Sequence, residues 1–181
     1  MPTTSRLLDA PALGRVLARM ASEIVERTAS HGPVVLVGIQ RRGVQLADRL
    51  APLIEPQLGQ PLRRGVLDIT LYRDDLQAIG PRPVVHQTKL PPDLDGTTVV
   101  IVDDVLFTGR TVRAALDEIA DFGRPRRVLL AVLVDRGGRE LPIAADITGL
   151  TVTTTHGDLV KVLVRDLDGD DAVDLVRGTS I

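Results

Sequence analysis

The stretch that decides the fold covers residues 99–111 and reads Val99-Val100-Ile101-Val102-Asp103-Asp104-Val105-Leu106-Phe107-Thr108-Gly109-Arg110-Thr111. Its first four residues are apolar and predict a buried strand that ends at the two carboxylates. A short loop follows, and the pattern of residues 111–122 predicts a helix behind it. A strand that leads through a short loop into a helix is half of a βαβ unit.

The rest of the chain repeats this alternation. Residues 34–39 and 128–134 are apolar runs of strand length, and residues 11–30 carry an apolar stripe with helical spacing. A second helix is expected after Gly43. Alternating strands and helices predict an α/β fold, with an open, mostly parallel sheet flanked by helices. Further extended segments are expected in the ranges 65–72, 84–88, 150–155, 159–164 and 172–176, the last three as edge strands or a small cap.

Composition limits the class of protein. The 181 residues suit a single domain, and the absence of cysteine excludes disulfides and thiolate metal sites. The three histidines lack metal-ligand spacing. No apolar run approaches about 18 residues and no signal pattern opens the chain, so we expect a soluble, cytoplasmic protein without a membrane partner. A net charge of −2 argues against a dedicated nucleic-acid binder.

The order of groups in residues 103–111 favours a phosphorylated sugar as ligand. A helix N-terminus binds phosphate through unpaired N–H groups, and Gly109 lets the backbone approach it. The hydroxyls of Thr108 and Thr111 add donors. Asp103 and Asp104 would accept hydrogen bonds from two vicinal sugar hydroxyls at the carboxyl end of the strand. The alternative is that both acids only begin the loop and cap the helix. No Walker or Rossmann fingerprint is present.

This segment closely resembles the motif of type I phosphoribosyltransferases that binds 5-phosphoribosyl diphosphate (PRPP). Two further segments resemble the PyrR family, the bifunctional pyrimidine operon attenuators and uracil phosphoribosyltransferases. They read Asp68-Ile69-Thr70-Leu71-Tyr72-Arg73-Asp74-Asp75 and Val134-Asp135-Arg136-Gly137, the latter followed by Arg139-Glu140-Leu141-Pro142. The resemblance covers nearly the whole chain in the same order.

The resemblance implies an enzyme that converts uracil and PRPP to UMP and pyrophosphate, with Mg²⁺ bound together with PRPP. Residues 99–111 would bind PRPP, with the Asp103–Asp104 pair on the ribose hydroxyls and Thr108–Thr111 around the 5-phosphate. It also implies one domain over residues 1–181, with a flexible catalytic loop at 73–83 and a hood with the C-terminal strands at 135–181. Relatives are commonly dimers or larger, so a homo-oligomer is expected.

The resemblance extends to the other parts of the site. Pyrophosphate would contact the segment that follows the strand at 34–39, namely Gly38, Gln40, Arg41, Arg42 and Gly43, with Arg41 or Arg42 as its cation. Arg73 would be a closing cation for the leaving pyrophosphate. The base would contact Val134, Asp135 and Arg136, mainly through backbone groups. The alternative for the two arginines is a solvated helix start, but their position beside a second strand terminus favours pyrophosphate contact. An ion pair explains the side chains of Asp135 and Arg136 equally well.

Family members also bind pyrimidine operon leader mRNA when UMP is present. The resemblance places RNA contacts at four arginines, Arg15, Arg19, Arg27 and Arg139. The chain departs from the family pattern at four other positions, where Gly138, Ala144, Leu150 and Ser22 replace basic residues or histidine. About three lost cations would weaken RNA binding by roughly an order of magnitude at moderate salt. Two alternatives stay open: an RNA-binding regulator with only vestigial catalysis, and a phosphoribosyltransferase for another base.

Overall fold

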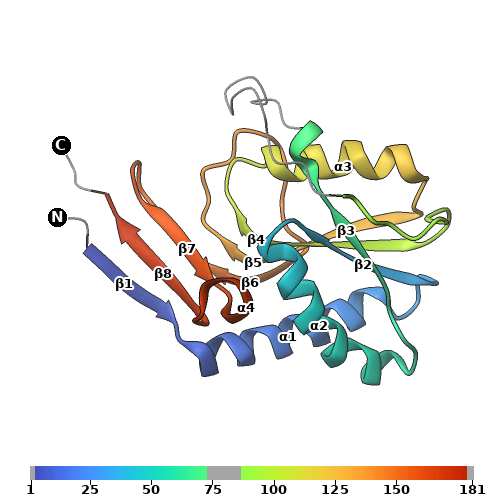
Figure 1. Ribbon diagram of the computed structural model, residues 1–181, viewed down its shortest axis with the longest axis horizontal. Helices are drawn as coiled ribbons and strands as arrows, with labels where there is room; N and C mark the ends of the chain where they lie inside the picture. Colours follow the sequence, from blue (N-terminus) through green and yellow to red (C-terminus); the bar gives the residue numbers. More distant parts are fainter. Residues whose placement is uncertain (1–2, 73–86, 179–181) are drawn as a thin grey trace.

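A computed structural model of the chain, which describes residues 3–72 and 87–178, contains a parallel sheet of five strands in the order β3-β2-β4-β5-β6 (Figure 1). Every neighbouring pair in this sheet is parallel. The strands are β2 (Val34–Ile39), β3 (Arg63–Leu67), β4 (Thr98–Leu106), β5 (Arg127–Asp135) and β6 (Ile147–Thr151). The open parallel α/β sheet predicted from the sequence is therefore confirmed.

Helices cover both faces of this sheet. The helices α1 (Ala10–Thr28) and α2 (Arg42–Leu58) pack on one face, and α3 (Arg110–Phe122) packs on the other with the short 3₁₀ helix η1 (Ile69–Tyr72) (Figure 1). Two apolar cores result because neighbouring residues of a strand point to opposite faces. In β4, Val100 joins the core under α1 and α2, whereas Ile101 joins the core under α3. Strands buried on both faces read as continuous apolar runs.

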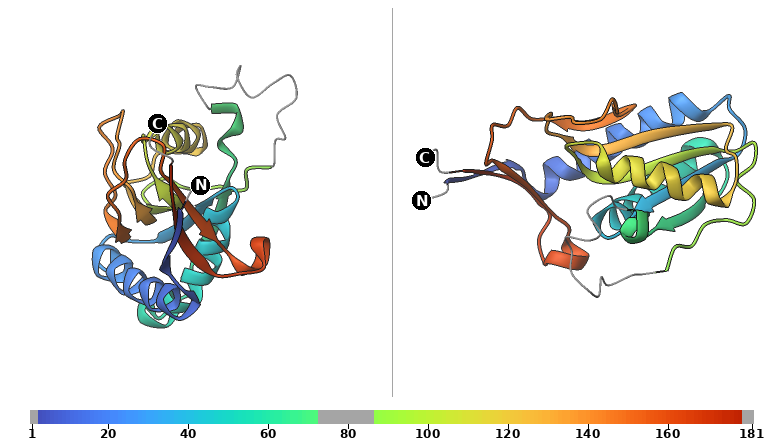
Figure 2. Two further views of the ribbon diagram at one scale, coloured as in Figure 1. Left: turned by 90° about the vertical axis from the view of Figure 1, so that its left-hand side faces the viewer. Right: turned by 90° about the horizontal axis from the view of Figure 1, so that it is seen from above.

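A second, antiparallel sheet lies at one end of the molecule (Figure 2). It has the order β1-β8-β7 and contains β1 (Thr3–Leu8), β7 (Leu159–Leu163) and β8 (Ala172–Arg177), with the short helix α4 (Arg165–Asp168) between the last two. The run expected at 150–155 begins instead within β6, an edge strand of the main sheet. The strand β1 was not predicted, because its partner β8 lies at the far end of the chain.

The prediction that the strand beginning at residue 99 stops before the acid pair is wrong. Strand β4 continues through Asp103 and Asp104 to Leu106, because β5 stays its neighbour as far as the pair Leu106–Asp135. On its other side, pairing with β2 ends at Gly38–Val102. The acid pair therefore lies on a stretch of β4 that is paired along one edge only, beyond the end of β2.

The strand expected over 65–72 is also wrong in its second half. Strand β3 ends at Leu67, and the 3₁₀ helix η1 follows at Ile69–Tyr72. Asp68 causes this turn, because its side-chain oxygen Oδ1 accepts a hydrogen bond from the backbone N–H of Thr70 at 3.0 Å. The catalytic loop that the resemblance implies at 73–83 lies outside the described residues. Of the extended arm expected at 84–88, only the last two residues are described, and they belong to no named strand.

None of the helices within the described ranges combines the length and the apolar character that a membrane crossing requires.

Candidate active site

The carboxyl ends of β2 and β4 open into a cavity of about 550 Å³. Side chains from the ends of three strands line it, together with one from α3. Arg41 and Gln40 come from the turn after β2, Asp68 and Thr70 from the turn after β3, and Asp103 and Asp104 from the end of β4. Thr111 adds a hydroxyl from the first turn of α3. Ligands of open α/β sheets bind at this edge because the loops that follow parallel strands converge there.

The acid pair is held in place by backbone hydrogen bonds. Asp103 is 7% exposed, and its oxygen Oδ1 accepts a hydrogen bond from the N–H of Asp104 at 2.9 Å. The oxygen Oδ1 of Asp104 in turn accepts from the N–H of Val105 at 3.0 Å. Burial raises the pKa of Asp103 well above its ordinary value, and the neighbouring Asp104 charge raises it further. The pair keeps acceptor capacity for a ligand, since each carboxylate offers about four lone-pair sites.

The loop between β4 and α3 has the geometry of an anion site. Gly109 is the N-cap of α3 with φ of +91°, and a Cβ there would lie 3.3 Å from the Cβ of Ile143. The carbonyl of Thr108 accepts hydrogen bonds from the N–H groups of Glu140 and Leu141, at 3.0 and 3.1 Å. The loop is thus tied to the segment at 140–143, while the first N–H groups of α3 have no intrahelical acceptor. The alternative role of the acids as helix caps is not supported, because Gly109 is the cap and the side chain that accepts from the first N–H of α3 is Thr108, with 3.3 Å between Arg110 N and Thr108 Oγ1.

Of the remaining residues of the predicted PRPP stretch, Val105 lines the cavity, whereas the others make contacts elsewhere in the fold. Arg110 pairs with Glu140 through Nε and Oε2 at 2.7 Å. Phe107 is 43% exposed and lines a different cavity, described below. The other apolar residues, Val99, Val100, Ile101, Val102 and Leu106, are at most 2% exposed and belong to the two cores.

The structure distinguishes the two arginines proposed for pyrophosphate. Arg41 is exposed, lines the cavity, and forms no ion pair with any described residue. Arg42 points instead to α4, where its Nη2 lies 2.7 Å from Asp168 Oδ1. The peptide bond between Gln40 and Arg41 is cis. Gly43 serves packing, because a Cβ on it would lie 2.4 Å from the carbonyl oxygen of Val102. Gly38 is a buried residue of β2.

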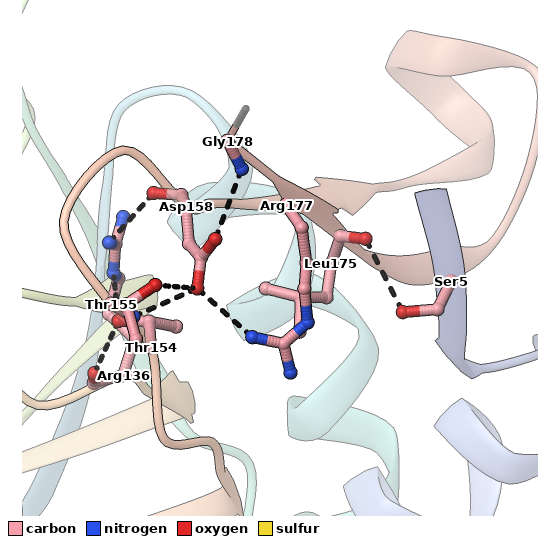
Figure 3. A network of polar contacts seen from close by, with 8 residues as sticks. All are labelled: Ser5, Arg136, Thr154, Thr155, Asp158, Leu175, Arg177 and Gly178. Atoms are coloured by element: carbon pink, nitrogen blue, oxygen red, sulfur yellow. Dashed lines mark hydrogen bonds and ion pairs between the residues drawn. The ribbon is translucent and has the colours of Figure 1, made fainter. Parts of the chain in front are cut away.

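The segment expected to contact the base holds its side chains in intramolecular contacts. Val134 is fully buried, and Asp135 accepts hydrogen bonds from Arg139 at 2.5 Å and from the N–H of Gly137 at 2.9 Å. Arg136 is 8% exposed and donates to the carbonyl of Asp158 at 2.8 Å (Figure 3). These contacts favour the structural account of both side chains. The backbone is also engaged, because the Arg136 N–H donates to the carbonyl of Leu106 at 3.1 Å and the Arg136 carbonyl accepts from the Thr154 hydroxyl at 3.0 Å.

A second cavity of about 420 Å³ adjoins this segment. Its walls are the ring of Phe107, the guanidinium of Arg136 and the loop at 154–158. The guanidinium lies 4.0 Å from the centre of the Phe107 ring, a cation–π distance. Asp158 anchors the loop, because its carboxylate accepts from Thr155 and from the N–H of Gly178 at the end of β8 (Figure 3). These contacts lower the pKa of Asp158, led by the bond from the Thr155 N–H.

The four arginines expected to contact RNA differ in their partners. Arg27 pairs with Glu23 at 3.1 Å, and Arg19 lies 4.0 Å from the same carboxylate while it donates to the carbonyl of Gly149. Arg139 donates to the carbonyls of Phe107 and Ile143, both at 2.9 Å, besides its pair with Asp135. Arg15 is exposed.

The positions where cations are replaced lie in different parts of the fold. Ala144 is exposed, Leu150 is half-buried in β6, and the hydroxyl of Ser22 bonds to the carbonyl of Ala18. At Gly138, a Cβ would lie 2.4 Å from Cε2 of Phe107.

Sequence reasoning named no site role for Asp68 and Thr70, although both line the cavity. They stood within the motif at 68–75, and the signal was an acid two residues before a threonine, which favours a side-chain turn. Thr154 and Asp158 gave no such signal. Their importance depends on Arg136, which lies about twenty residues away in sequence. Arg73 lies outside the described residues.

Comparison with known sequences identifies close relatives. The chain matches the model of the phosphoribosyl transferase domain over residues 3–162. It is 54% identical over 171 residues to "Bifunctional protein PyrR" of Thermus aquaticus, and the aligned residues cover 94% of each chain. It is also 54% identical over 180 residues to the protein of that name from Chloroflexus aurantiacus, covering 99% of each.

Solved structures give the same fold at lower sequence identity. The hypoxanthine phosphoribosyltransferase of Trypanosoma cruzi superimposes with a TM-score of 0.74 at 17% identity, covering 97% of each chain. That of Staphylococcus aureus gives a TM-score of 0.70 at 16% identity, covering 97% of this chain and 92% of the other. Together with the identity to its relatives, these matches confirm the resemblance. The chain belongs to the PyrR family of phosphoribosyltransferases.

Proposed function

We propose that this chain transfers the phosphoribosyl group of PRPP to uracil and releases pyrophosphate and UMP. The observation that carries the proposal is that the acid pair of β4 and the N-terminus of α3 belong to one sequence segment and face one cavity. A phosphorylated ribose has two vicinal hydroxyls and a terminal anion, and the cavity offers acceptors for the former and donors for the latter.

In this proposal each group has one task. Asp103 and Asp104 accept hydrogen bonds from the ribose hydroxyls and stabilise positive charge that develops on the sugar in the transition state. Thr108–Thr111 and the first N–H groups of α3 hold the 5-phosphate. Arg41 binds the pyrophosphate, which leaves as N1 of uracil attacks C1 of the ribose. Arg73 and residues 73–83 keep the closing role that the resemblance assigns to them.

The donors at the cavity suit Mg²⁺ bound together with PRPP. Mg²⁺ prefers oxygen ligands and is commonly held by one or two carboxylates with the phosphates of a substrate. Asp103 and Asp104 supply carboxylates of this kind at the cavity. When bound, the ion offsets the charge of the departing pyrophosphate.

The second cavity supports uracil as the acceptor base. Its wall at Phe107 belongs to the loop that binds the 5-phosphate, so a base held there would lie next to the ribose site. The antiparallel sheet β1-β8-β7 would form the hood at this end, within a single phosphoribosyltransferase domain. The family supports uracil rather than a purine, and a homodimer or larger assembly is part of the same proposal.

Product formation from PRPP, Mg²⁺ and a panel of free bases tests the acceptor. We expect UMP from uracil and little product from hypoxanthine, guanine or orotate. A chain that favours a purine would refute uracil as the substrate and leave the ribose site intact.

The variant Asp104→Asn tests the ribose site itself. Asparagine keeps the acceptor for the Val105 N–H but loses the charge. We expect kcat/KM for PRPP to fall about a hundredfold, the usual effect of removing one electrostatic group from a transition state. Asp117→Asn on the exposed side of α3 is the matched control. Equal turnover by wild type and Asp104→Asn would exclude the acid pair as the ribose clamp.

A second activity, binding of pyrimidine operon leader mRNA in the presence of UMP, follows from the family. Vestigial catalysis alongside it is not favoured, because the acid pair, Arg41 and the α3 terminus all remain at the cavity. Filter binding of a leader hairpin with and without UMP tests the RNA activity. UMP-enhanced binding would support it, and equal weak binding in both conditions would exclude it.

A further inference from the structure

A buried carboxylate that the proposed reaction does not use lies behind the cavity. Glu118 of α3 is 3% exposed. Its oxygen Oε1 accepts a hydrogen bond from the hydroxyl of Thr88, while Oε2 has no hydrogen-bond partner among the described residues. A buried acceptor without a partner costs about 1–3 kcal/mol. Glu118 therefore lowers stability where it stands.

The electrostatic surroundings of Glu118 add to this cost. Burial raises the pKa of Glu118, the bond from Thr88 opposes the rise, and the Asp68 and Asp121 carboxylates add to it. A leucine or methionine would fill this place in an apolar core at lower cost.

The hydroxyl of Thr88 joins Glu118 to the cavity wall. While it donates to Glu118, its oxygen accepts the backbone N–H of Asp68 at 3.0 Å. A threonine hydroxyl has one hydrogen to donate and two lone pairs that accept. Because Glu118 takes the hydrogen, the lone pairs of the Thr88 oxygen are left to accept the Asp68 N–H. The next residue, Lys89, pairs with Val66 of β3 through two backbone bonds of 2.7 and 2.9 Å, which place Thr88 beside the end of β3.

Asp68 passes this order on to the cavity. Its carboxylate accepts from both the N–H and the hydroxyl of Thr70, at 3.0 and 2.5 Å, and Asp68, Ile69 and Thr70 all line the cavity. A hydrogen-bonded series thus runs from Glu118 in the α3 layer through the Thr88 hydroxyl to the Asp68 N–H, and the Asp68 carboxylate continues it to Thr70 at the cavity.

We propose that Glu118 and Thr88 are positioning residues for the PRPP site, and that they act by holding the Asp68–Thr70 wall in place through the Thr88 hydroxyl. This rests on the proposed function. The wall follows the end of β3, and no strand within the described ranges pairs with it beyond Leu67. Ile69 packs in the core under α3, and the bond from the Asp68 N–H to the Thr88 hydroxyl adds a second constraint. A displacement of about 1 Å in a group that positions substrate can reduce a rate by up to a hundredfold. Loss of one hydrogen bond loosens the wall by less, and we expect it to weaken PRPP binding rather than to slow the chemical step.

Three variants separate the members of this series. Thr88→Val removes the hydroxyl at nearly constant volume. Glu118→Met removes the acceptor at similar length, whereas Glu118→Gln keeps an acceptor oxygen and loses the charge. Thr98→Val is the matched control, because Thr98 is fully buried at the opposite end of β4 and its hydroxyl bonds to the carbonyl of His31 at 3.1 Å.

We expect Thr88→Val and Glu118→Met each to raise the KM for PRPP about fivefold, the worth of one net hydrogen bond, with kcat within about twofold of wild type. Glu118→Gln should restore the KM. The double variant Thr88→Val/Glu118→Met should be no worse than either single variant, because both remove the same link. Thr98→Val should lower the Tm and leave the KM unchanged.

Hydrogen exchange of the Asp68 amide gives a readout without turnover. We expect it to exchange about fivefold faster in Thr88→Val and Glu118→Met than in wild type, Glu118→Gln or Thr98→Val. Wild-type KM and protection in Thr88→Val would refute the positioning role, as would a Glu118→Gln variant as impaired as Glu118→Met. If calorimetry with Mg²⁺ detects no PRPP binding by wild type, the proposed function fails. If wild type binds PRPP and only the variants bind it more weakly, the proposed function stands and the positioning role is supported.

Discussion

The cavity at the end of β4 and the arginine-bearing side of α1 both present charged side chains, but they differ in how those charges are paired. In the cavity, Asp103 and Asp104 accept only backbone N–H groups in the bonds described, and Arg41 forms no ion pair with a described residue. On α1, Arg19 and Arg27 both lie beside Glu23. A charge already paired within the protein must lose that partner before it binds a ligand.

The same contrast holds for stability. The raised pKa of Asp103 means that its charge is held at a cost in the folded chain. The pairs on α1 are exposed and spaced four residues apart, where an ion pair contributes only a few tenths of a kcal/mol. The unpaired charges therefore indicate the binding site better than the number of cations does. Four predictions test this comparison, from the largest expected effect to the smallest.

Asp103→Asn should separate activity from stability. We expect kcat/KM for PRPP to fall by at least about a hundredfold. The Tm at neutral pH should rise by a few degrees, because the folded pKa of Asp103 exceeds the unfolded one and its ionisation favours unfolding. This gain should shrink as the pH falls through the folded pKa, where wild type is also neutral. Thermal unfolding over a pH series measures it, and an unchanged or lower Tm at neutral pH would contradict the assigned cost.

Arg41→Gln and Arg42→Gln form a matched pair on adjacent residues. Arg41 faces the cavity, so its loss should raise the KM for PRPP about thirtyfold, within the range of one charge-assisted hydrogen bond. Arg42 is held by Asp168, so its loss should change the KM little and lower the Tm slightly. Steady-state kinetics with PRPP measures both variants. The reverse order of effects would show that pairing does not predict which arginine binds.

Gly109→Ala tests the anion end of the cavity. An alanine there meets both a φ of +91° and a Cβ contact of 3.3 Å with Ile143, so the loop must shift. A left-handed alanine costs about 1–2 kcal/mol, which the loop can relieve by moving. We expect this movement to displace the N–H groups at the start of α3 and to raise the KM for PRPP about tenfold. Gly96→Ala is the control, with a φ of +70° and open space around its Cβ. If Gly109→Ala and Gly96→Ala gave the same KM for PRPP, the alanine at residue 109 would not displace the anion end of the cavity, and this prediction would be contradicted.

Glu23→Gln should sharpen the other side of the comparison. It releases Arg19 and Arg27 together, so affinity for a leader hairpin should rise about threefold, with a salt dependence steeper by about one phosphate contact. Glu26→Gln makes the same change in net charge one turn away on the same helix, and no ion pair among the described residues involves Glu26. Filter binding over a salt series measures both. An identical gain in the two variants would assign the effect to net charge rather than to released arginines.

Much of the fold follows from local patterns in the sequence. The strand at 34–39 agrees with the structure to the residue, and the helices at 11–30 and 111–122 agree within two residues at each end. Each is a periodic or continuous apolar segment, whose period is set by the backbone itself. Strand β1 and the turn at Asp68 could not be predicted in this way. The first depends on pairing with residues 172–177, and the second on one side-chain hydrogen bond.

The candidate site divides along the same line. Residues 103–111 were predictable because an acid pair, a glycine and a threonine loop stand next to one another along the chain, where strand and helix bring them to one place. The choice of Arg41 over Arg42 was not, since it depends on Asp168, more than a hundred residues away. The partners of Arg136 and of Glu118 likewise come from distant segments.

The amino-acid sequence by itself thus determined the parallel α/β architecture and the place of the proposed sugar-phosphate site, because both arise from contacts between residues close along the chain. Only the tertiary structure decided which charged groups stay available for a ligand. That choice depends on contacts between segments far apart in sequence, such as Arg42 with Asp168 and Thr88 with Glu118. Such pairs leave no periodic signal, since a hydrogen bond or an ion pair requires only that two groups meet in space.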